Sequence, residues 1–343
     1  MTTPRRSLTA LAACTGAAVL LSACGSSVEE DTAGASPADT VTVANALPTL
    51  TLVEEDGESS LQEDLDTERG SVEVPLAPEA VVTFDIATLD TLDSIGAGDS
   101  VVGIPDVTLP DYLAEYASLP TVGTLFEPDF EAVAELDPDL IVTAGRSTGQ
   151  YDELAEIATT IDLTGGYGGT FDPEAAMARA EQLGEVFGRE DEVAEQVADL
   201  EGQVEEIADS VSGTALVLSV SGGEYSAFGE GSRFGWFYDT LGFTPAVVAA
   251  QLPGEPGSPH GESVSNEFIL SAAPEWIIAF DRGAATGDSA TLEATLDNEL
   301  VGQTVAAEQD QVVYLPASEL YIVTNGLTAI GNVLDVVQDA VQA

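Results

Sequence analysis

The sequence has no lysine, a single histidine (His260) and only two cysteines (Cys14 and Cys24) in its 343 residues. So few nitrogen and sulfur ligands exclude a structural zinc site built from Cys and His, and also a framework of several disulfides. The eight basic residues are all arginines and stand against 61 acidic residues, which gives a formal net charge of −53. A surface this negative repels phosphate backbones, so we expect no nucleic-acid partner.

The shortage of basic residues does not make this a disordered acidic chain. Hydrophobic residues make up 44% of the sequence, enough to build a core. A chain of this length can form two ordinary domains with separate cores. We therefore expect a folded protein.

The N-terminus predicts export and a lipid anchor. Residues 1–23 contain two arginines, no acid and an apolar stretch that is short for a membrane span, which is typical of a signal peptide. The stretch runs into LSACG at residues 21–25, which resembles the bacterial lipoprotein box, where the cysteine is acylated. We expect an extracytoplasmic protein held at the cell membrane by lipid on Cys24. The alternative is an ordinary export signal with an incidental cysteine, and the export route (Sec or Tat) stays open.

The chain after Cys24 divides by composition and periodicity. Residues 24–70 are rich in Ser, Thr, Asp and Glu and predict an acidic flexible tether, with a first strand around 49–53. Short apolar runs then alternate with helical patterns, which predicts an N-terminal α/β lobe over 71–171. The predicted strands of this lobe lie at 81–84, 101–104 and 140–143, and the helices at 87–95 and 129–136.

A helical stretch separates this lobe from a second one. Residues 172–212 predict two helices, of which the second, at 190–211, would be about 33 Å long at ~1.5 Å per residue. The alternation then restarts and predicts a C-terminal α/β lobe over 213–343. Its strands are expected at 215–220, 276–280 and 312–315, and its helices at 235–241 and 327–341. The fold class is thus α/β, with two lobes joined by a long helix; the alternative is one continuous α/β domain.

Three arginines lie where α/β proteins bind ligands. Arg146 and Arg282 each follow a predicted strand, and Arg233 lies in a glycine-rich turn. Ligands of α/β sheets bind at the carboxyl ends of the strands, so three cations there predict an anionic ligand. The alternative is that each arginine pairs with a nearby acid, such as Asp281 or Glu230.

Two further residues have side chains that can bind a metal ion. His260 lies in a loop rich in glycine and proline, and Tyr321 lies between the last predicted strand and the last helix. Imidazole and phenolate are competent ligands for a ferric ion that already carries oxygen donors. The alternatives are an idle loop for His260 and a tyrosine packed on the lobe surface for Tyr321.

Short motifs in both predicted lobes carry a family resemblance. In the first lobe they are FD at 84–85, LDTL at 89–92, EPDFE at 127–131, PDLI at 138–141 and GR at 145–146. In the second lobe they are GSRFG at 231–235, HGESV at 260–264 and DR at 281–282. Together they resemble the ferric-siderophore-binding proteins of bacterial ABC importers, in particular the branch for catecholate siderophores of the petrobactin and enterobactin-fragment type. The resemblance runs from about residue 72 to the C-terminus.

The resemblance implies a fold and a set of roles. The fold would be that of a class III periplasmic binding protein. The protein would be a monomeric carrier without enzymatic activity or an intrinsic cofactor, since Fe³⁺ arrives with its siderophore. Arg146, Arg233 and Arg282 would neutralise the ferric catecholate.

The remaining roles concern the iron and the permease. His260 and Tyr321 would complete the coordination of the iron when the siderophore offers four oxygens. The family usually has two adjacent aromatic residues at the second position, and this chain keeps one. Glu131 and Glu267 would present a carboxylate on each lobe to the ABC permease.

Other functions fit the residues less well. An exported hydrolase would need a nucleophile elbow, and no Gly-x-Ser-x-Gly is present. A bare-metal carrier would need more than one histidine. A haem- or corrinoid-binding protein of a related importer remains the alternative, although three arginines suit a highly charged anion better.

Overall fold

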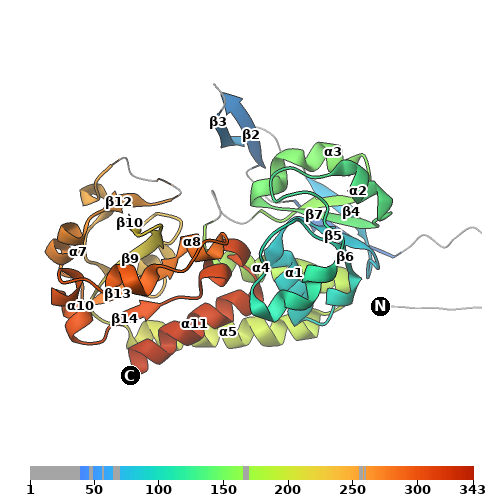
Figure 1. The fold of residues 1–343 in the computed structure, drawn as a ribbon. Helices are drawn as coiled ribbons and strands as arrows, with labels where there is room; N and C mark the ends of the chain where they lie inside the picture. Colours follow the sequence, from blue (N-terminus) through green and yellow to red (C-terminus); the bar gives the residue numbers. More distant parts are fainter. Residues whose placement is uncertain are drawn as a thin grey trace, which may run out of the picture. The chain divides into compact units, whose positions relative to one another are not determined.

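Figure 1 shows the fold of the protein in a computed structural model. The structure describes residues 39–45, 49–55, 58–64, 70–164, 170–254, 258 and 260–343. By its contacts the chain divides into two units, Met1–Pro37 and Ala38–Ala343, and every described residue belongs to the second. The expected signal peptide and Cys24 lie outside the described residues. No helix within the described ranges has both the length and the apolar character needed to cross a membrane.

A four-stranded parallel sheet forms the centre of the N-terminal lobe. Its order is β6 (Val101–Gly103), β5 (Val81–Thr83), β7 (Leu140–Thr143) and β8 (Thr160–Asp162). β5 and β7 are buried along their whole length, as is typical of central strands covered on both faces. The helices of this lobe are α1 (Ile86–Ser94), α2 (Phe130–Glu135) and α3 (Tyr151–Ala155). α1 and α2 begin at Asp85 and Asp129, whose carboxylates accept hydrogen bonds from backbone amides of the first turn.

The N-terminal lobe begins earlier in the chain than its composition predicts. β1 (Thr40–Ala44) pairs antiparallel with β4 (Ser71–Pro75). Next to β1, the buried Asn45 donates from Nδ2 to the Tyr151 hydroxyl at 3.1 Å and accepts from the Asp162 amide at 2.7 Å. The expected flexible tether up to residue 70 is therefore too long, because residues 40–45 belong to the folded lobe. β2 (Thr49–Glu55) and β3 (Glu58–Asp64) form a hairpin within the same stretch.

The C-terminal lobe is built on a six-stranded mixed sheet. The order is β12 (Glu262–Val264), β10 (Glu224–Phe228), β9 (Thr214–Ser221), β13 (Trp276–Asp281) and β14 (Val312–Tyr314), and β11 (Thr244–Pro245) also pairs with β9. β9, β13 and β14 are parallel, as predicted, whereas β10 runs antiparallel to both β9 and β12. The strand–helix alternation misses β10, because Gly222 and Gly223, at φ of 59° and 83°, return the chain directly from β9.

The C-terminal lobe contains mainly short helices, and short 3₁₀ segments occur in both lobes. The helices of the C-terminal lobe are α6 (Trp236–Asp239), α7 (Asn266–Ala272), α8 (Arg282–Ala285), α9 (Leu292–Leu296) and α10 (Val305–Glu308). Among the described residues, 3₁₀ segments are η1 (Gly98–Ser100), η2 (Asp111–Ser118), η3 (Gly145–Gln150), η5 (Ala249–Gln251) and η6 (Val301–Gln303). A π-helix, η7 (Glu319–Val323), precedes the last helix, α11 (Leu327–Gln342).

Long helices join the two lobes. α4 (Pro173–Phe187) ends at Gly188, which adopts φ of 61°, and α5 (Glu190–Ser210) follows. α5 has 21 residues, or about 32 Å at ~1.5 Å per residue. α11 packs along α5 and also contacts α1 and α4 (Figure 1).

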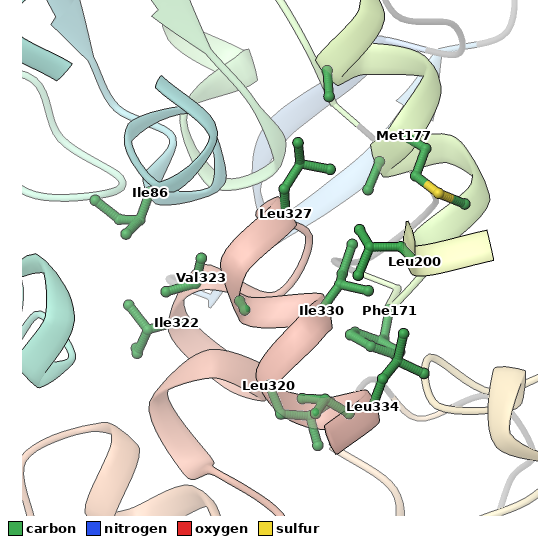
Figure 2. Close-up of a cluster of buried hydrophobic side chains, with 14 of the residues drawn as sticks. Ile86, Phe171, Met177, Leu200, Leu320, Ile322, Val323, Leu327, Ile330 and Leu334 are labelled. Carbon is green, nitrogen blue, oxygen red and sulfur yellow. The ribbon is translucent and has the colours of Figure 1, made fainter. Parts of the chain in front are cut away.

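These helices share one hydrophobic core. Figure 2 shows Leu327, Ile330 and Leu334 of α11 beside Leu200 of α5 and Ile86 of α1. The same cluster of buried residues continues into both lobes. Because the two sheets are separate, the two-lobed α/β class is confirmed; by their contacts the two lobes still form one compact unit around the shared core.

Candidate functional site

Arg146 lies at the carboxyl end of β7, as the sequence predicts. It is the second residue of η3, which begins at Gly145 with φ of 48°. The Arg146 guanidinium is half-buried, and its Nη2 donates a hydrogen bond to the backbone carbonyl of Tyr321 at 3.0 Å. Arg146 of the N-terminal lobe thus reaches a residue 175 positions away in the chain.

Arg233 lies in a turn whose backbone depends on glycine. Gly231 has φ of 72°, and a Cβ at Gly235 would come within 2.7 Å of the Gly231 nitrogen. The turn places Arg233 against Phe234, with its Cζ 4.8 Å from the ring centroid. The Arg233 side chain is 8% exposed, and its Nε and Nη2 have no hydrogen-bond partner.

Arg282 is the first residue of α8 and follows β13 directly. The preceding Asp281 is buried and is fully used as a cap: its carboxylate accepts from the amides of Ala284 at 2.9 Å, Thr291 at 2.5 Å and Leu292 at 2.8 Å. Asp281 therefore stabilises the loop that carries Arg282.

The nearby acids do not pair with these arginines. Glu230 accepts from the Ala249 amide at 3.0 Å, and Asp281 accepts from backbone amides. In the part of the chain that the structure describes, the ion pair found is Arg189 with Glu192, at 3.9 Å and exposed. The alternative in which Asp281 or Glu230 satisfies a neighbouring arginine is thus wrong for the described structure.

The predicted site residues are brought together by the fold. The ring centroid of Tyr321 lies 5.0 Å from Cζ of Arg233 and 5.9 Å from Cζ of Arg146, so both guanidinium groups are close to this ring. Burial lowers the pKa of Arg233 to about 10, and the charges of Arg146 and Arg282 add to that effect, while Tyr321 opposes it. The pKa of His260 is lowered by partial burial and then by the charges of Arg282 and Arg233, so His260 interacts electrostatically with both arginines, while its side chain remains exposed.

Residues that the sequence analysis did not single out complete the site. The ring of Phe280, at the end of β13, lies 6.4 Å from that of Tyr321, with 28° between the ring planes. Phe280 also packs on Phe234, so an aromatic cluster supports both Tyr321 and the turn that carries Arg233. The sequence shows Phe280 only as an apolar residue of a buried strand, which is no signal for a site.

A cavity of about 340 Å³ is lined by residues of both lobes. Residues of the loop after β6 (Asp106, Val107, Thr108), of the α8 region (Ala285, Thr286) and of η7 (Ile322) line it. A larger cavity of about 780 Å³ lies within the C-terminal lobe, where Glu293, Asp297 and Asp310 contribute carboxylates to its lining. The three carboxylates of the larger cavity would repel an anion, whereas the smaller cavity has a single acid, Asp106, in its lining.

Glu131 and Glu267 lie outside this cluster, one on each lobe, in matching positions. Glu131 is in the first turn of α2, two residues after the cap Asp129, and Glu267 is in the first turn of α7, two residues after the cap Ser265. Both glutamates are exposed. The Ser265 hydroxyl lowers the pKa of Glu267, so this carboxylate is charged at neutral pH.

Comparisons with known proteins identify the family of this chain. The family model for periplasmic binding proteins matches residues 81–319. The chain is 33% identical over 280 residues to the petrobactin-binding protein YclQ of Bacillus subtilis, covering 80% of this chain and 86% of YclQ. It is 29% identical over 280 residues to the ferric-anguibactin-binding protein FatB of Vibrio anguillarum, covering 78% of this chain and 83% of FatB.

Solved structures show the same fold. The crystal structure of YclQ matches with a TM-score of 0.74 at 31% identity, over 89% of this chain and 99% of YclQ. The periplasmic catecholate-siderophore binding protein VctP from Vibrio cholerae matches with a TM-score of 0.73 at 29% identity, over 88% of this chain and 100% of VctP. These relatives are binding proteins rather than enzymes. The chain therefore belongs to the periplasmic binding protein family and has its class III fold.

Proposed function

We propose that this protein captures a ferric catecholate siderophore outside the cytoplasm and delivers it to the permease of an ABC importer. The observation that carries the proposal is Arg233, a cation that is 8% exposed and has two guanidinium nitrogens without a hydrogen-bond partner. A buried charge with unsatisfied N–H groups is costly unless a ligand supplies acceptors. An anionic ligand with several oxygens would satisfy it.

The surroundings of Arg233 favour a ligand with more than one negative charge. Arg146 and Arg282 interact electrostatically with Arg233, so three guanidinium groups repel one another at this place. Guanidinium groups form strong, directional hydrogen bonds to anionic oxygens, and a ferric catecholate offers several of these. The named ligands of YclQ and VctP support this class, since they are petrobactin and catecholate siderophores.

His260 and Tyr321 are proposed to bind the iron itself when the siderophore leaves coordination positions free. The lowered pKa of His260 keeps its imidazole neutral at pH 7, as a metal ligand must be. Fe³⁺ is cargo in this proposal and arrives with the siderophore, so the protein needs no resident cofactor.

The remaining roles follow from the family. Cys24 would carry the lipid that holds the protein at the membrane, and a monomer would then approach the permease. Glu131 and Glu267, exposed at matching helix starts on the two lobes, would contact arginines of that permease.

Titration with chosen iron complexes, followed by tryptophan fluorescence, tests the proposal. Trp236 and Trp276 provide the signal, and ferric catecholates should quench it at far lower concentration than a neutral ferric hydroxamate does. The iron-free catechol ligand and haem are the comparators. Quenching by haem, with no response to ferric catecholates, would reject the siderophore and establish the haem or corrinoid alternative.

A further inference from the structure

Asp90 holds together two parts of the molecule that are far apart in the sequence. It lies on α1 of the N-terminal lobe and is 0% exposed. Its Oδ1 accepts from the Thr328 amide at 2.9 Å, and its Oδ2 accepts from the Ala329 amide at 3.1 Å and from the Tyr112 hydroxyl at 2.6 Å. The two amides belong to the first turn of α11, so Asp90 caps this helix from another element.

The start of α11 has no side-chain cap of its own, and its N-cap glycine leaves room for Asp90. The residue before the helix is Gly326, which provides no capping side chain. A Cβ at Gly326 would lie 2.3 Å from Cγ of Asp90, so a residue larger than glycine does not fit there. Glycine thus lets the carboxylate approach the helix closely.

The capped turn follows directly on the segment that carries Tyr321. η7 is a π-helix, a rare form that often occurs at functional sites. It ends at Thr324, whose φ of 64° is strained for a β-branched residue. Such backbone persists only where the surrounding structure holds it in place.

Tertiary contacts supply the required restraint on this segment. Arg146 donates to the Tyr321 carbonyl, and the Asn325 side chain bonds to the backbone before α4, with Thr170 O at 2.8 Å and Asp172 N at 2.9 Å. Leu320, Ile322 and Val323, which flank Tyr321 in the sequence, are buried in the hydrophobic cluster that Figure 2 shows. The segment 321–329 is thus held at its start by Arg146, in its middle by the Asn325 side chain and at its end by Asp90.

We propose that Asp90 is a positioning residue for Tyr321, which it places at the ligand through the capped start of α11 without touching the ligand itself. The inference rests on the proposed role of Tyr321 as an iron ligand. It identifies a function for the LDTL motif at 89–92, which the ligand site does not otherwise use.

A matched pair of variants tests it. Asp90→Asn replaces one of the two side-chain oxygens that accept hydrogen bonds from α11 and Tyr112 by an amide nitrogen, which cannot accept them. Asp93→Asn is the control, because Asp93 also lies on α1 and accepts a tyrosine hydroxyl, that of Tyr116, at 2.6 Å. A milder pair is Tyr112→Phe with Tyr116→Phe as its control. Amide hydrogen exchange of the ligand-free protein is measured over 319–329 and, as an internal reference, over β9.

We expect faster exchange over 319–329 in Asp90→Asn, a smaller effect in Tyr112→Phe, and no change in the controls or in β9. Unchanged exchange at 319–329 would overturn the anchoring, whatever the ligand proves to be. General unfolding would also contradict it, and would be recognised by equal acceleration in β9.

Binding then tests the link to Tyr321. Asp90→Asn should weaken a tetradentate ferric catecholate roughly tenfold, the effect of losing a helix cap, and leave a hexadentate one nearly unchanged. Adding Tyr321→Phe to Asp90→Asn should cause little further loss. Equal losses of affinity for the tetradentate and the hexadentate ligand would contradict a positioning role of Asp90. Full additivity of the effects of Asp90→Asn and Tyr321→Phe on affinity would also contradict it. Failure of the unaltered protein to bind any ferric catecholate would instead reject the proposed function, with the anchoring still decided by exchange.

Discussion

Arg233 is stabilised by aromatic rings rather than by a counter-ion. Its guanidinium lies 4.8 Å from the Phe234 ring centroid and 5.0 Å from that of Tyr321. Cation–π contacts offset part of the cost of burying a charge, but they leave Nε and Nη2 of Arg233 without acceptors. The side chain is thus held in place before the ligand arrives, which reduces the ordering cost of binding.

Removing one arginine of the cluster should weaken anion binding selectively. Arg233→Ala or Arg282→Ala is expected to cost ~2–5 kcal/mol in the binding of a ferric catecholate, the usual effect of breaking a buried charge pair. A neutral ferric hydroxamate should lose much less. Dissociation constants from tryptophan quenching measure both, with Arg189→Ala as the control, because Arg189 pairs with Glu192 at the surface. An unchanged constant for the catecholate would contradict the anion site.

His260 should affect the iron rather than the charge of the ligand. A bis-catecholate with four donor oxygens leaves two positions on the iron, which His260 and Tyr321 would fill, so its charge-transfer band should shift on binding. His260→Ala should abolish most of that shift, while affinity falls but persists, since the arginines remain. A hexadentate tris-catecholate is the control and should show little shift with either protein. If the variant keeps the original spectrum with both ligands, His260 does not coordinate the iron.

At the scale of elements, the start of α11 combines a buried carboxylate with a helix terminus. Burial raises the pKa of Asp90 from its ordinary value of 3.8 to about 7, although hydrogen bonds from Tyr112, Thr328 and Ala329 act in the opposite direction. Asp93 raises it further, and Glu319 of η7, whose own pKa is raised by burial, also interacts with Tyr112. Ionisation of Asp90 is therefore unfavourable in the folded protein, even though the charged form is the better cap.

This predicts a pH dependence of stability. The folded state keeps the Asp90 proton up to about pH 7, while the unfolded chain releases it near 3.8. The contribution of Asp90 to the free energy of unfolding is therefore fully present below pH 3.8, the pKa in the unfolded chain. It is lost as the pH rises through 7, by at most about 1.4 kcal/mol per pH unit. Between pH 5 and 8 the free energy of unfolding should fall by about 2–3 kcal/mol more in the unaltered protein than in Asp90→Asn.

Urea unfolding at pH 5, 6, 7 and 8 measures this difference. Comparing the two proteins cancels the general effect of pH on so acidic a chain, and Asp93→Asn shows whether a neighbouring carboxylate gives the same result. Parallel stability curves for the unaltered protein and Asp90→Asn would show that Asp90 does not titrate in this range.

At the scale of the whole molecule, positive charge is scarce and concentrated. The chain after residue 23 has six arginines against 61 acids, and three of the six belong to the proposed ligand site. An acidic surface with one basic site would favour entry of an anion only at close range, because the Debye length is about 8 Å at physiological salt. Short-range contacts at the arginines, rather than steering by the whole protein, should thus determine ligand binding.

The two exposed glutamates should matter for delivery and not for capture. Glu131→Gln and Glu267→Gln, singly and together, are expected to reduce uptake of the ferric siderophore by cells, since each removes a charge offered to the permease. Ligand affinity of the purified variants should stay the same. Glu135→Gln, at the exposed end of α2, is the control. Normal uptake by the double variant would exclude these glutamates as permease contacts.

The lipid anchor can be tested on whole cells. Cys24→Ala should release the protein from the membrane into the medium or a soluble fraction, because no acyl chain could be attached. Fractionation followed by immunodetection measures this. Retention of the variant in the membrane fraction would argue against lipid on Cys24.

The sequence by itself determined the local structure of this protein. The apolar runs of β5, β7, β9 and β13 identify these strands, because a buried strand shows as a continuous apolar run within a few residues. The same patterns placed Arg146 and Arg282 at strand ends. The antiparallel β10 and the early strand β1 were not found, since pairing with a distant or reversed partner leaves only a short, ordinary pattern in the sequence.

Only the tertiary structure decided how these pieces form a site. Packing of two separate sheets on one helical core brings Arg146 to Tyr321 across 175 residues and Asp90 to α11 across 238. It also decides which carboxylates can neutralise an arginine, because Asp281 is already used by backbone amides. Composition shows that acids are abundant, but the geometry of hydrogen bonds determines that none of the nearby ones satisfies Arg233.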